Sequence, residues 1–467
     1  MHLPANLVPN GEALSPTTKL NISKPLSHFP TEIFDAAETL EHLDLSGTGL
    51  STLPEDFGRL EKLKIALFSN CNFSVFPKEL AQCPELEMVA FRGNRMAEVP
   101  ENSLPPKLRW LILTNNEIES LPKSIGQCAR LQKCMLSGNK LRSLPDEMAA
   151  CKKLGLLRLS ANRIAELPGW LFELPELAFL SFAGNPCAAA VPKHDDESHA
   201  TDTPSSRLAD VSWADLDVHH LLGEGASGII SKGHWNGIDR AHREVAIKLF
   251  KGDVTSDGTP TDEMRACLRA GPHANLIDPL GKIRDHPDRR EGLVMQLIPS
   301  SRYRTLGQPP SLQTCTRDRF APGAAALTTR QGLGILRGVA AAVGHLHARG
   351  VAHGDLYAHN VLFSDDGHAL LGDFGAASVY DKQEQEKEQK QHYGRVEQLE
   401  ALAFAHLIED VWSLMKPRFS EEELRVSMRL AALHRRCSSP VGPERPSFGE
   451  INRQLGEMDQ LDDGTSS

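Results

Sequence analysis

Residues 154–164 read LGLLRLSANRI, and residues 108–118 read LRWLILTNNEI. Both follow the pattern L-x-x-L-x-L-x-x-N-x-L, with isoleucine in the last position. An apolar residue followed by proline accompanies the pattern at spacings of 22 or 23 residues, at Leu53-Pro54, Phe76-Pro77, Val99-Pro100, Leu121-Pro122, Leu144-Pro145 and Leu167-Pro168. A fixed period of this size predicts a solenoid, in which each unit buries its apolar face only against its neighbours.

The repeat pattern has a physical reason. Its L-x-L part turns alternate side chains of a short strand inward, and its Asn side chain satisfies backbone groups where the coil turns. The Asn column reads Thr48, Cys71, Asn94, Asn116, Asn139, Asn162 and Asn185, so the first two coils depart from Asn. Over about residues 40 to 187 the pattern resembles leucine-rich repeats. The resemblance implies an α/β repeat solenoid, with expected boundaries 26–187 after a poorly defined segment 1–25.

The residues that flank the inward strand position are expected to line the concave face of the solenoid. Most of them are apolar: Ile65, Leu67, Met88, Trp110, Ile112, Met135, Leu156 and Phe179. Arg158 and Ser181 are polar members of the same columns near the end of the stack. An apolar patch on an exposed sheet usually marks a protein-binding site. We therefore expect a protein substrate or regulator on this face, or another part of the chain docked there, unless the column assignment slips by one residue.

Composition narrows the functional classes. The chain has 467 residues and a formal net charge of −10, so it lacks the overall basic surface that binding to nucleic acid needs. It has no apolar run of the length that crosses a membrane. Its nine cysteines are scattered and form no C-x-x-C pair, which favours buried, reduced thiols in a cytoplasmic protein. Export by an unrecognised signal stays open.

Residues 188–212 differ in composition from both flanks. They are small, acidic and polar residues with two prolines and no helical or strand period, which predicts a flexible linker between two domains. A cluster of histidine and acidic residues at 194–199 has metal-binding side chains. A charge run in a linker is more often simply solvated, and we interpret it in that way.

The second half begins with two motifs suited to phosphate. Residues 222–230 read LGEGASGII, which contains G-x-G-x-x-G, and such glycines let backbone amides approach phosphate oxygens without a Cβ in the way. Residues 245–248 read VAIK, an alternating strand that ends in Lys248 and can place an ammonium beside the phosphates. Fifteen residues further, Glu263 begins an apolar-periodic segment that predicts a helix carrying its ion-pair partner.

Two more motifs follow. Residues 353–360 read HGDLYAHN, and residues 373–375 read DFG. In order and spacing, the five elements resemble the protein-kinase family over about residues 213–455, which implies a two-lobed α+β kinase-like domain and a C-terminal tail at 456–467. The resemblance also implies ATP and Mg²⁺ as cofactors and a Ser/Thr protein kinase that includes autophosphorylation. The residues themselves leave the choice between Ser/Thr and Tyr open.

The resemblance assigns roles to individual residues. Asp355 would accept the proton of the substrate hydroxyl, Lys248 would position the phosphates with Glu263 as its partner, and a one-residue shift of that partner stays open. Asn360 and Asp373 would hold magnesium. The nucleotide would contact Leu222, Gly223, Glu224, Gly225, Ala226, Ser227, Gly228, Ile230, Ala246, Lys248, Met295, Gln296, Leu297 and Leu362. His345, His347 and His353 are interpreted as packed or hydrogen-bonded groups rather than metal ligands.

The sequence departs from the family on the acceptor side. Gly354 stands where the family usually has Arg, and Tyr357 stands where a Lys is common. No A-P-E triplet lies between residues 375 and 396, so the peptide-docking platform is expected to be shortened or missing. Arg445 thereby loses its usual acidic partner, and it needs another one or lies in solvent.

These features support one leading hypothesis and two alternatives. The leading one is an ATP- and Mg-dependent protein kinase whose repeats recruit a substrate or restrain the catalytic domain. The first alternative is a pseudokinase or scaffold that binds nucleotide and assembles protein partners. The second is a kinase of small molecules, which the appended protein-binding solenoid disfavours.

Overall fold

The computed structural model describes residues 17–188, 208–225, 228–236, 242–251, 254–321, 326–380, 393–416 and 420–462. Ala226, Ser227, the acidic cluster of the linker and the charged run at 381–392 lie outside these ranges. The chain divides into two compact units. The first comprises Met1–Leu157 and Asn162–Leu174. The second comprises Arg158–Ala161 and Pro175–Ser467, and we call it the kinase unit; its residues Arg158–Ala161 and Pro175–Ala188 are called the terminal coil.

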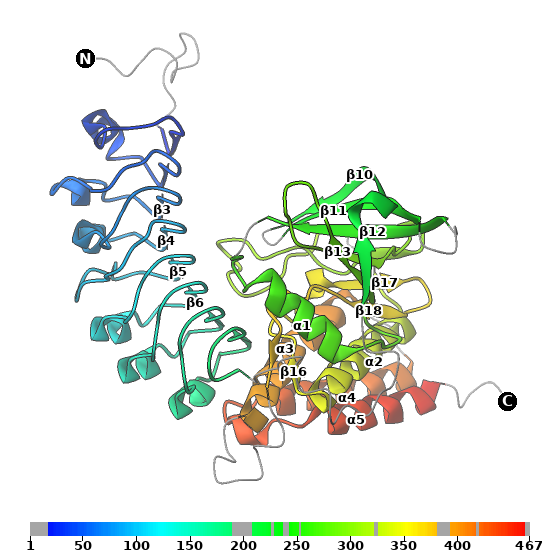
Figure 1. Cartoon of the computed structure of the whole chain (residues 1–467). Helices are drawn as coiled ribbons and strands as arrows, with labels where there is room; N and C mark the ends of the chain where they lie inside the picture. Colours follow the sequence, from blue (N-terminus) through cyan, green and yellow to red (C-terminus); the bar gives the residue numbers. More distant parts are fainter. Residues whose placement is uncertain are drawn as a thin grey trace, which may run out of the picture. The chain divides into compact units, whose positions relative to one another are not determined.

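The repeats form one sheet of eight three-residue strands in chain order (Figure 1). The strands are β1 Lys19–Asn21, β2 His42–Asp44, β3 Ile65–Leu67, β4 Met88–Ala90, β5 Trp110–Ile112, β6 Lys133–Met135, β7 Leu156–Arg158 and β8 Phe179–Ser181. The leucine-rich-repeat prediction is confirmed. β1 pairs in parallel with β2, so the sheet begins before the expected boundary at residue 26.

Short 3₁₀ helices lie between the strands. They are η1 Thr31–Ala36, η2 Phe57–Arg59, η3 Lys78–Gln82, η4 Lys123–Gln127, η5 Asp146–Ala150 and η6 Gly169–Glu173. All except η2 follow directly on a proline with an extended backbone, such as Pro77 at φ −66° and Pro122 at φ −67°. Because proline fixes φ near this value, an apolar-Pro pair marks where five of these six helices begin.

The Asn column ties neighbouring coils together. Asn116 Nδ2 donates to Phe91 O at 2.8 Å and to Leu113 O at 2.9 Å, and its Oδ1 accepts from the backbone of Asn94 and Met96. In the first coil Thr48 Oγ1 donates to Leu45 O at 2.7 Å. Thr and Cys therefore replace part of the Asn bonding, which is how the first coils tolerate the departure from Asn.

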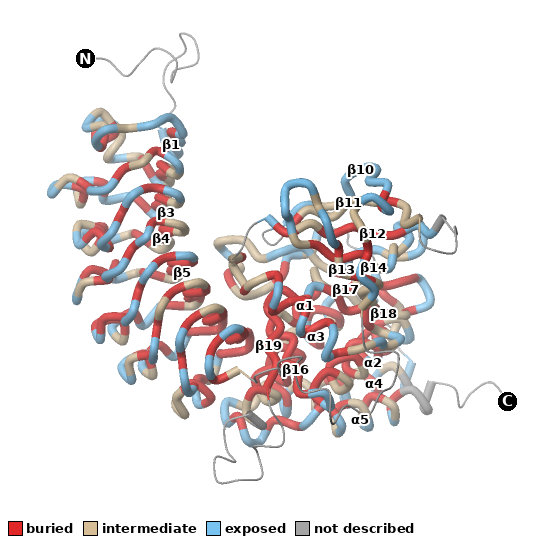
Figure 2. The backbone as a smooth tube through the Cα atoms, viewed as in Figure 1, coloured by how far each residue is buried: buried red, intermediate tan, exposed pale blue. Residues whose placement is uncertain are grey.

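The face predicted to bind a partner changes along the sheet. Ile65, Leu67, Met88, Trp110, Ile112 and Met135 are half-buried. Leu156 is only 4% exposed and Phe179 only 1%. Phe179 belongs to the terminal coil, so the last strand of the repeats is covered within the kinase unit. In the same unit, β16 and β19 are buried along their whole length (Figure 2).

The smaller lobe of the kinase unit is a six-stranded sheet in the order β10-β11-β12-β14-β13-β9. Its elements are β9 Ala209–Ser212, η7 Trp213–Asp215, β10 Leu216–Glu224, β11 Gly228–Asn236, β12 His242–Phe250, α1 Pro260–Ala270, β13 Pro279–Arg284 and β14 Gly292–Gln296. Val245, Ile247 and Val294 belong to its buried core. β9 pairs in parallel with β13, so the sheet includes residues that the sequence placed in the linker.

The larger lobe is helical. Its elements are β15 Tyr303–Thr305, α2 Thr329–Ala348, β16 Val351–Ala352, η8 Ala358–Asn360, β17 Val361–Ser364, β18 Ala369–Leu371, β19 Ser378–Val379, α3 Tyr393–Leu414, α4 Glu421–Cys437, η10 Gly442–Glu444 and α5 Phe448–Asp462. A capping box at Thr328 and Gln331 begins α2, which is buried along Leu333, Leu336 and Val343. The predicted two-lobed α+β fold is confirmed.

Candidate active site

The nucleotide side of the site is built around a buried ion pair. Lys248 lies on β12 and donates from Nζ to Glu263 Oε1 of α1 at 2.7 Å. Both side chains are nearly inaccessible, at 6% and 5% exposure. Burial lowers the pKa of Lys248, but the carboxylates of Asp373 and Glu263 outweigh it, and the pKa lies above its ordinary value. The lysine therefore stays charged, as its predicted contact with phosphate requires.

The two residues expected to hold magnesium lie beside this pair and beside the catalytic loop, which we define as residues 353–360. Asp373 Oδ1 lies 3.7 Å from Lys248 Nζ, and its side chain is 48% exposed. The residue adopts φ +57°, a left-handed backbone that non-glycine residues rarely adopt. Asn360 Nδ2 donates to Asp355 O at 2.9 Å and to Asp355 Oδ2 at 2.8 Å. These bonds use its amide hydrogens and leave its carbonyl oxygen as an acceptor.

The described residues expected to contact the nucleotide lie on or next to five strands. Gly223, on β10, is paired with Ile230 on β11, and the backbone N–H of Gly225 donates to Gly228 O at 3.0 Å. Ala246 on β12 lies opposite Met295 on β14. Gln296 ends β14 and is followed by Leu297, while Leu362 lies on β17, in the other lobe. The predicted contacts with adenine and phosphate stay predictions.

Asp355 has both carboxylate oxygens occupied by protein groups. Oδ2 accepts a hydrogen bond from Asn360, and Oδ1 accepts one from Nη2 of Arg158. Arg158 Nη1 donates to Gly354 O at 2.7 Å, and its Nε lies 2.8 Å from Asp257 Oδ1. The guanidinium is 2% exposed, so it is fully enclosed between the two carboxylates. The sequence placed Arg158 in the correct column but gave no sign of these partners, which lie up to 197 residues away.

The two departures from the family pattern both contact the terminal coil. Gly354 has φ +73°, and a Cβ there would lie 2.6 Å from Ala376 O and 2.7 Å from Leu180 O. No side chain therefore fits at this position. The ring of Tyr357 stacks on Phe179 with centroids 3.9 Å apart and planes 10° apart. Burial raises the pKa of Tyr357 well above its ordinary value, so the phenol stays neutral.

The segment after the DFG motif also binds the terminal coil. Ser378 Oγ accepts hydrogen bonds from the backbone N–H groups of Phe182 at 2.9 Å and of Ala183 at 3.1 Å. β19, which begins at Ser378, pairs antiparallel with β16. Tyr380 then donates to Glu397 Oε1 at 2.7 Å. The described part of this segment is therefore held between the helical lobe and the residues that directly follow the last repeat strand.

The histidines upstream of the catalytic loop have structural partners. His347 Nε2 lies 2.6 Å from Glu400 Oε2, and His353 Nε2 lies 2.9 Å from Gly372 O. Glu400 also accepts from the Gly354 N–H at 2.6 Å. Burial raises the pKa of Glu400, but these bonds outweigh it and hold the pKa below its ordinary value. No group of three or more metal-binding His, Cys, Asp or Glu side chains occurs within the described ranges.

Arg445 has partners other than a carboxylate. It is 4% exposed and donates to three backbone oxygens, those of Ser439 at 2.8 Å, Gln398 at 3.2 Å and Pro175 at 3.3 Å. The alternative of a solvated Arg445 is wrong. Burial lowers its pKa to about 10. Since Pro175 belongs to the terminal coil, this residue adds a further contact between that coil and the helical lobe.

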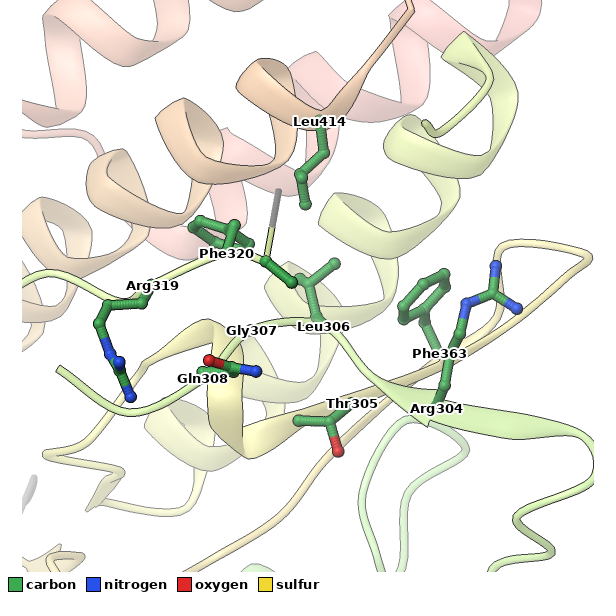
Figure 3. A pocket seen from close by; sticks show the side chains of 10 residues that line it. Arg304, Thr305, Leu306, Gly307, Gln308, Arg319, Phe320, Phe363 and Leu414 are labelled. Atoms are coloured by element: carbon green, nitrogen blue, oxygen red, sulfur yellow. The ribbon is translucent and has the colours of Figure 1, made fainter. Parts of the chain in front are cut away.

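Two hollows lie elsewhere in the kinase unit. One, of about 190 Å³, is lined by Leu306, Phe320 and Leu414, with Arg304 lying over the Phe363 ring at 4.4 Å (Figure 3). The other, of about 720 Å³, borders Gln296 and Leu297. Neither is lined by Lys248, Asp355 or Asp373, so the predicted catalytic groups lie outside both.

Comparison with known proteins agrees with this architecture. Residues 216–415 match the family described as protein tyrosine and serine/threonine kinase. Residues 106–164 and 39–60 match leucine-rich repeats. The chain thus combines leucine-rich repeats with a protein kinase domain.

Three relatives illustrate the two parts. The megakaryocyte-associated tyrosine-protein kinase of Rattus norvegicus is 33% identical over 177 residues, which is 37% of this chain and 33% of the relative. Kinase suppressor of Ras 2 of Homo sapiens is 27% identical over 176 residues, 36% of this chain and 16% of the relative. The PH domain leucine-rich repeat-containing protein phosphatase 1 of Homo sapiens is 40% identical over 94 residues, 20% of this chain and 5% of the relative. The chain thus spans a third or less of each relative.

Proposed function

We propose that the chain is an ATP- and magnesium-dependent protein kinase that phosphorylates serine or threonine, including its own residues. The observation that carries the proposal is the assembled nucleotide side: a buried Lys248–Glu263 pair at 2.7 Å with Asp373 at 3.7 Å from the same ammonium. An uncompensated buried carboxylate would destabilise the fold by several kcal/mol, so the pair must stay intact for α1 to pack. A phosphate-positioning lysine is therefore held in place before any ligand binds.

In this proposal the acceptor hydroxyl oxygen forms a bond to the γ-phosphorus of ATP, and the bond from that phosphorus to the bridging oxygen of ADP breaks. The hydroxyl proton passes to the carboxylate of Asp355. Lys248 neutralises phosphate charge, and the glycine-rich motif at 222–230 offers backbone N–H groups to the phosphate oxygens. The protein contributes mainly position and charge, because the phosphoryl group itself needs little covalent assistance.

The residues present fit magnesium. Mg²⁺ prefers oxygen ligands, and the Asp373 carboxylate with the carbonyl oxygen of Asn360 supply them. The half-exposed Asp373 side chain leaves room for the further oxygens of water and phosphate that this ion needs. When bound, the ion neutralises charge that develops on the transferred group.

The proposal is tested with the full chain, radiolabelled ATP and Mg²⁺. Asp355→Asn is expected to lower phosphate transfer by about 10²- to 10⁴-fold, since a general base is lost while side-chain volume is kept. Nucleotide affinity should change little. Asp365→Asn, at a carboxylate that is 83% exposed in the same lobe, is the matched control and should leave transfer unchanged. Acid hydrolysis of the labelled protein identifies the phosphorylated residue type.

Transfer by Asp355→Asn at the wild-type rate would contradict the role of this carboxylate. Absence of transfer in the wild type and in Arg158→Gln, which frees one oxygen of Asp355, would favour the second candidate if Mg-ATP still binds. The second candidate is a scaffold that binds nucleotide and assembles protein partners. That candidate is favoured by the occupation of both Asp355 oxygens by Arg158 and Asn360.

Leucine-rich repeats typically mediate protein binding, and we propose that the half-buried apolar strand face of the first unit recruits a protein substrate or regulator.

We also propose a cytoplasmic location. All nine cysteines are buried thiols, which suits a reducing compartment. No helix in the part of the chain that the structure describes combines the length and apolar character needed to cross a bilayer.

A further inference from the structure

Arg158 joins the two lobes of the kinase unit across the catalytic loop. Its Nε lies 2.8 Å from Asp257 Oδ1, in the smaller lobe just before α1, and its Nη2 binds Asp355 Oδ1 in the larger lobe. Ser181 of the same coil donates to Asp257 O at 3.3 Å. Burial lowers the pKa of Arg158, but the two carboxylates outweigh it and the pKa lies above its ordinary value. The guanidinium therefore stays charged at this position.

The consequence for Asp355 is that both of its carboxylate oxygens are occupied. A general base needs an oxygen within hydrogen-bonding distance of the hydroxyl from which it takes a proton. Oδ1 is bonded to a cation and Oδ2 to Asn360, and the side chain is 16% exposed. With both oxygens bonded to protein groups, an acceptor hydroxyl has no free carboxylate oxygen to which it can pass its proton.

The surrounding contacts hold the terminal coil in this place. Phe179 stacks on Tyr357, the backbone N–H groups of Phe182 and Ala183 donate to Ser378, and Leu180 O occupies the space beside Gly354. These contacts lie on both sides of Asp355 in the sequence. The coil thus covers the catalytic loop and the segment after DFG, where a kinase needs an open surface for a protein acceptor.

We propose that the terminal coil is an autoinhibitory element, in which Arg158 blocks the acceptor side of Asp355 while the nucleotide side stays ready. This inference rests on the proposed kinase function. It assigns a specific inhibitory role to a residue of the repeat region. The protein acceptor reaches Asp355 only after the guanidinium has moved away from the carboxylate.

The test compares the full-length wild type with Arg158→Gln, which removes the charge and keeps polar contacts and much of the volume. Autophosphorylation and transfer to dephosphorylated casein are measured with radiolabelled Mg-ATP. We expect Arg158→Gln to increase transfer at least tenfold. Arg163→Ala, at an exposed arginine five residues further along the chain, is the matched control and should stay at the wild-type rate.

Two additions keep the test decisive. Asp257→Asn removes the charge that pairs with Arg158 from the smaller lobe, and we expect a smaller increase in phosphate transfer. This variant replaces Arg158→Gln in the test if Arg158→Gln does not fold. Hydrogen exchange of the peptide that covers residues 353–360 provides a readout that does not depend on catalysis. Exchange there should rise in Arg158→Gln and not in Arg163→Ala.

The outcomes separate the two proposals. Transfer by the wild type without any gain in Arg158→Gln or Asp257→Asn overturns autoinhibition and leaves the kinase function standing. A loss of transfer in Arg158→Gln, with exchange unchanged, overturns it as well and makes Arg158 a positioning residue. If no variant transfers phosphate although Mg-ATP binds, the proposed kinase function is wrong. In that case, unchanged hydrogen exchange at 353–360 in Arg158→Gln would also overturn the proposed block of Asp355 by Arg158.

Discussion

The two sides of the candidate active site differ in how closely they follow the kinase pattern. On the nucleotide side, Lys248, Glu263 and Asp373 lie together as the family motifs imply. On the acceptor side, Gly354 and Tyr357 replace the expected Arg and Lys, and both contact the terminal coil. The contrast shows that the two departures from the kinase pattern are structurally related. Gly354 and Tyr357 belong to one surface, and this surface is complementary to a strand of the chain's own repeats.

The first prediction breaks this surface at its largest apolar contact. Phe179→Ala removes a ring that is 1% exposed and stacked on Tyr357, and we expect the free energy of unfolding of the kinase unit to fall by about 3–5 kcal/mol. Urea or thermal unfolding measures the change. Tyr357→Phe is the informative control, because its buried hydroxyl has no hydrogen-bond partner among the described groups, and its removal should cost little or nothing. Equal, small effects of the two variants would contradict the stacked interface.

The second prediction tests why glycine stands at position 354. Gly354→Ala combines φ +73° with a Cβ 2.6 Å from Ala376 O and 2.7 Å from Leu180 O. Destabilisation by about 2–4 kcal/mol is expected from strain and overpacking. In Gly456→Ala, by contrast, a Cβ in α5 meets nothing within 4 Å, and helix propensity should raise stability by up to about 1 kcal/mol. The approach of the coil would be refuted if Gly354→Ala were as harmless as that control.

The third prediction concerns the smallest part of the same surface. Ser378→Ala leaves the backbone N–H groups of Phe182 and Ala183 without their acceptor inside the protein. We expect a loss of about 1–3 kcal/mol in the free energy of unfolding. Faster hydrogen exchange at these two amides should accompany the loss. Unchanged protection of both amides would show that Ser378 does not attach the segment to the coil.

Much of this architecture could be predicted because it depends on local patterns. The 22- or 23-residue period, the apolar-Pro pairs and the order of the kinase motifs are all visible in one sequence. They place the strands of the repeats, the strand that ends near Lys248 and the helix that carries Glu263. Each of these depends on residues close together in the chain.

The acceptor side could not be predicted in the same way. Its central contacts join residues such as Arg158 and Gly354, which are 196 positions apart, and no periodicity records such a pairing. The sequence did show each partner of this contact as unusual. Arg158 is a polar residue in a mostly apolar column, and Gly354 stands where the kinase family usually has Arg. Only the geometry shows that they belong together. The backbone partner of Arg445 could not be predicted for the same reason, because Pro175 O lies 270 positions away in the chain.

The membership of the terminal coil in the kinase unit has a consequence for a chain cut between residues 189 and 207. Such a cut would yield two polypeptides, one of which carries Phe179 and Arg158 and the other Tyr357 and Asp355. Since the ring stack, the ion pairs and the Ser378 bonds do not depend on the peptide bonds in between, the two fragments should remain a noncovalent complex and elute together. The two parts of this protein would then behave like the subunits of a heterodimer.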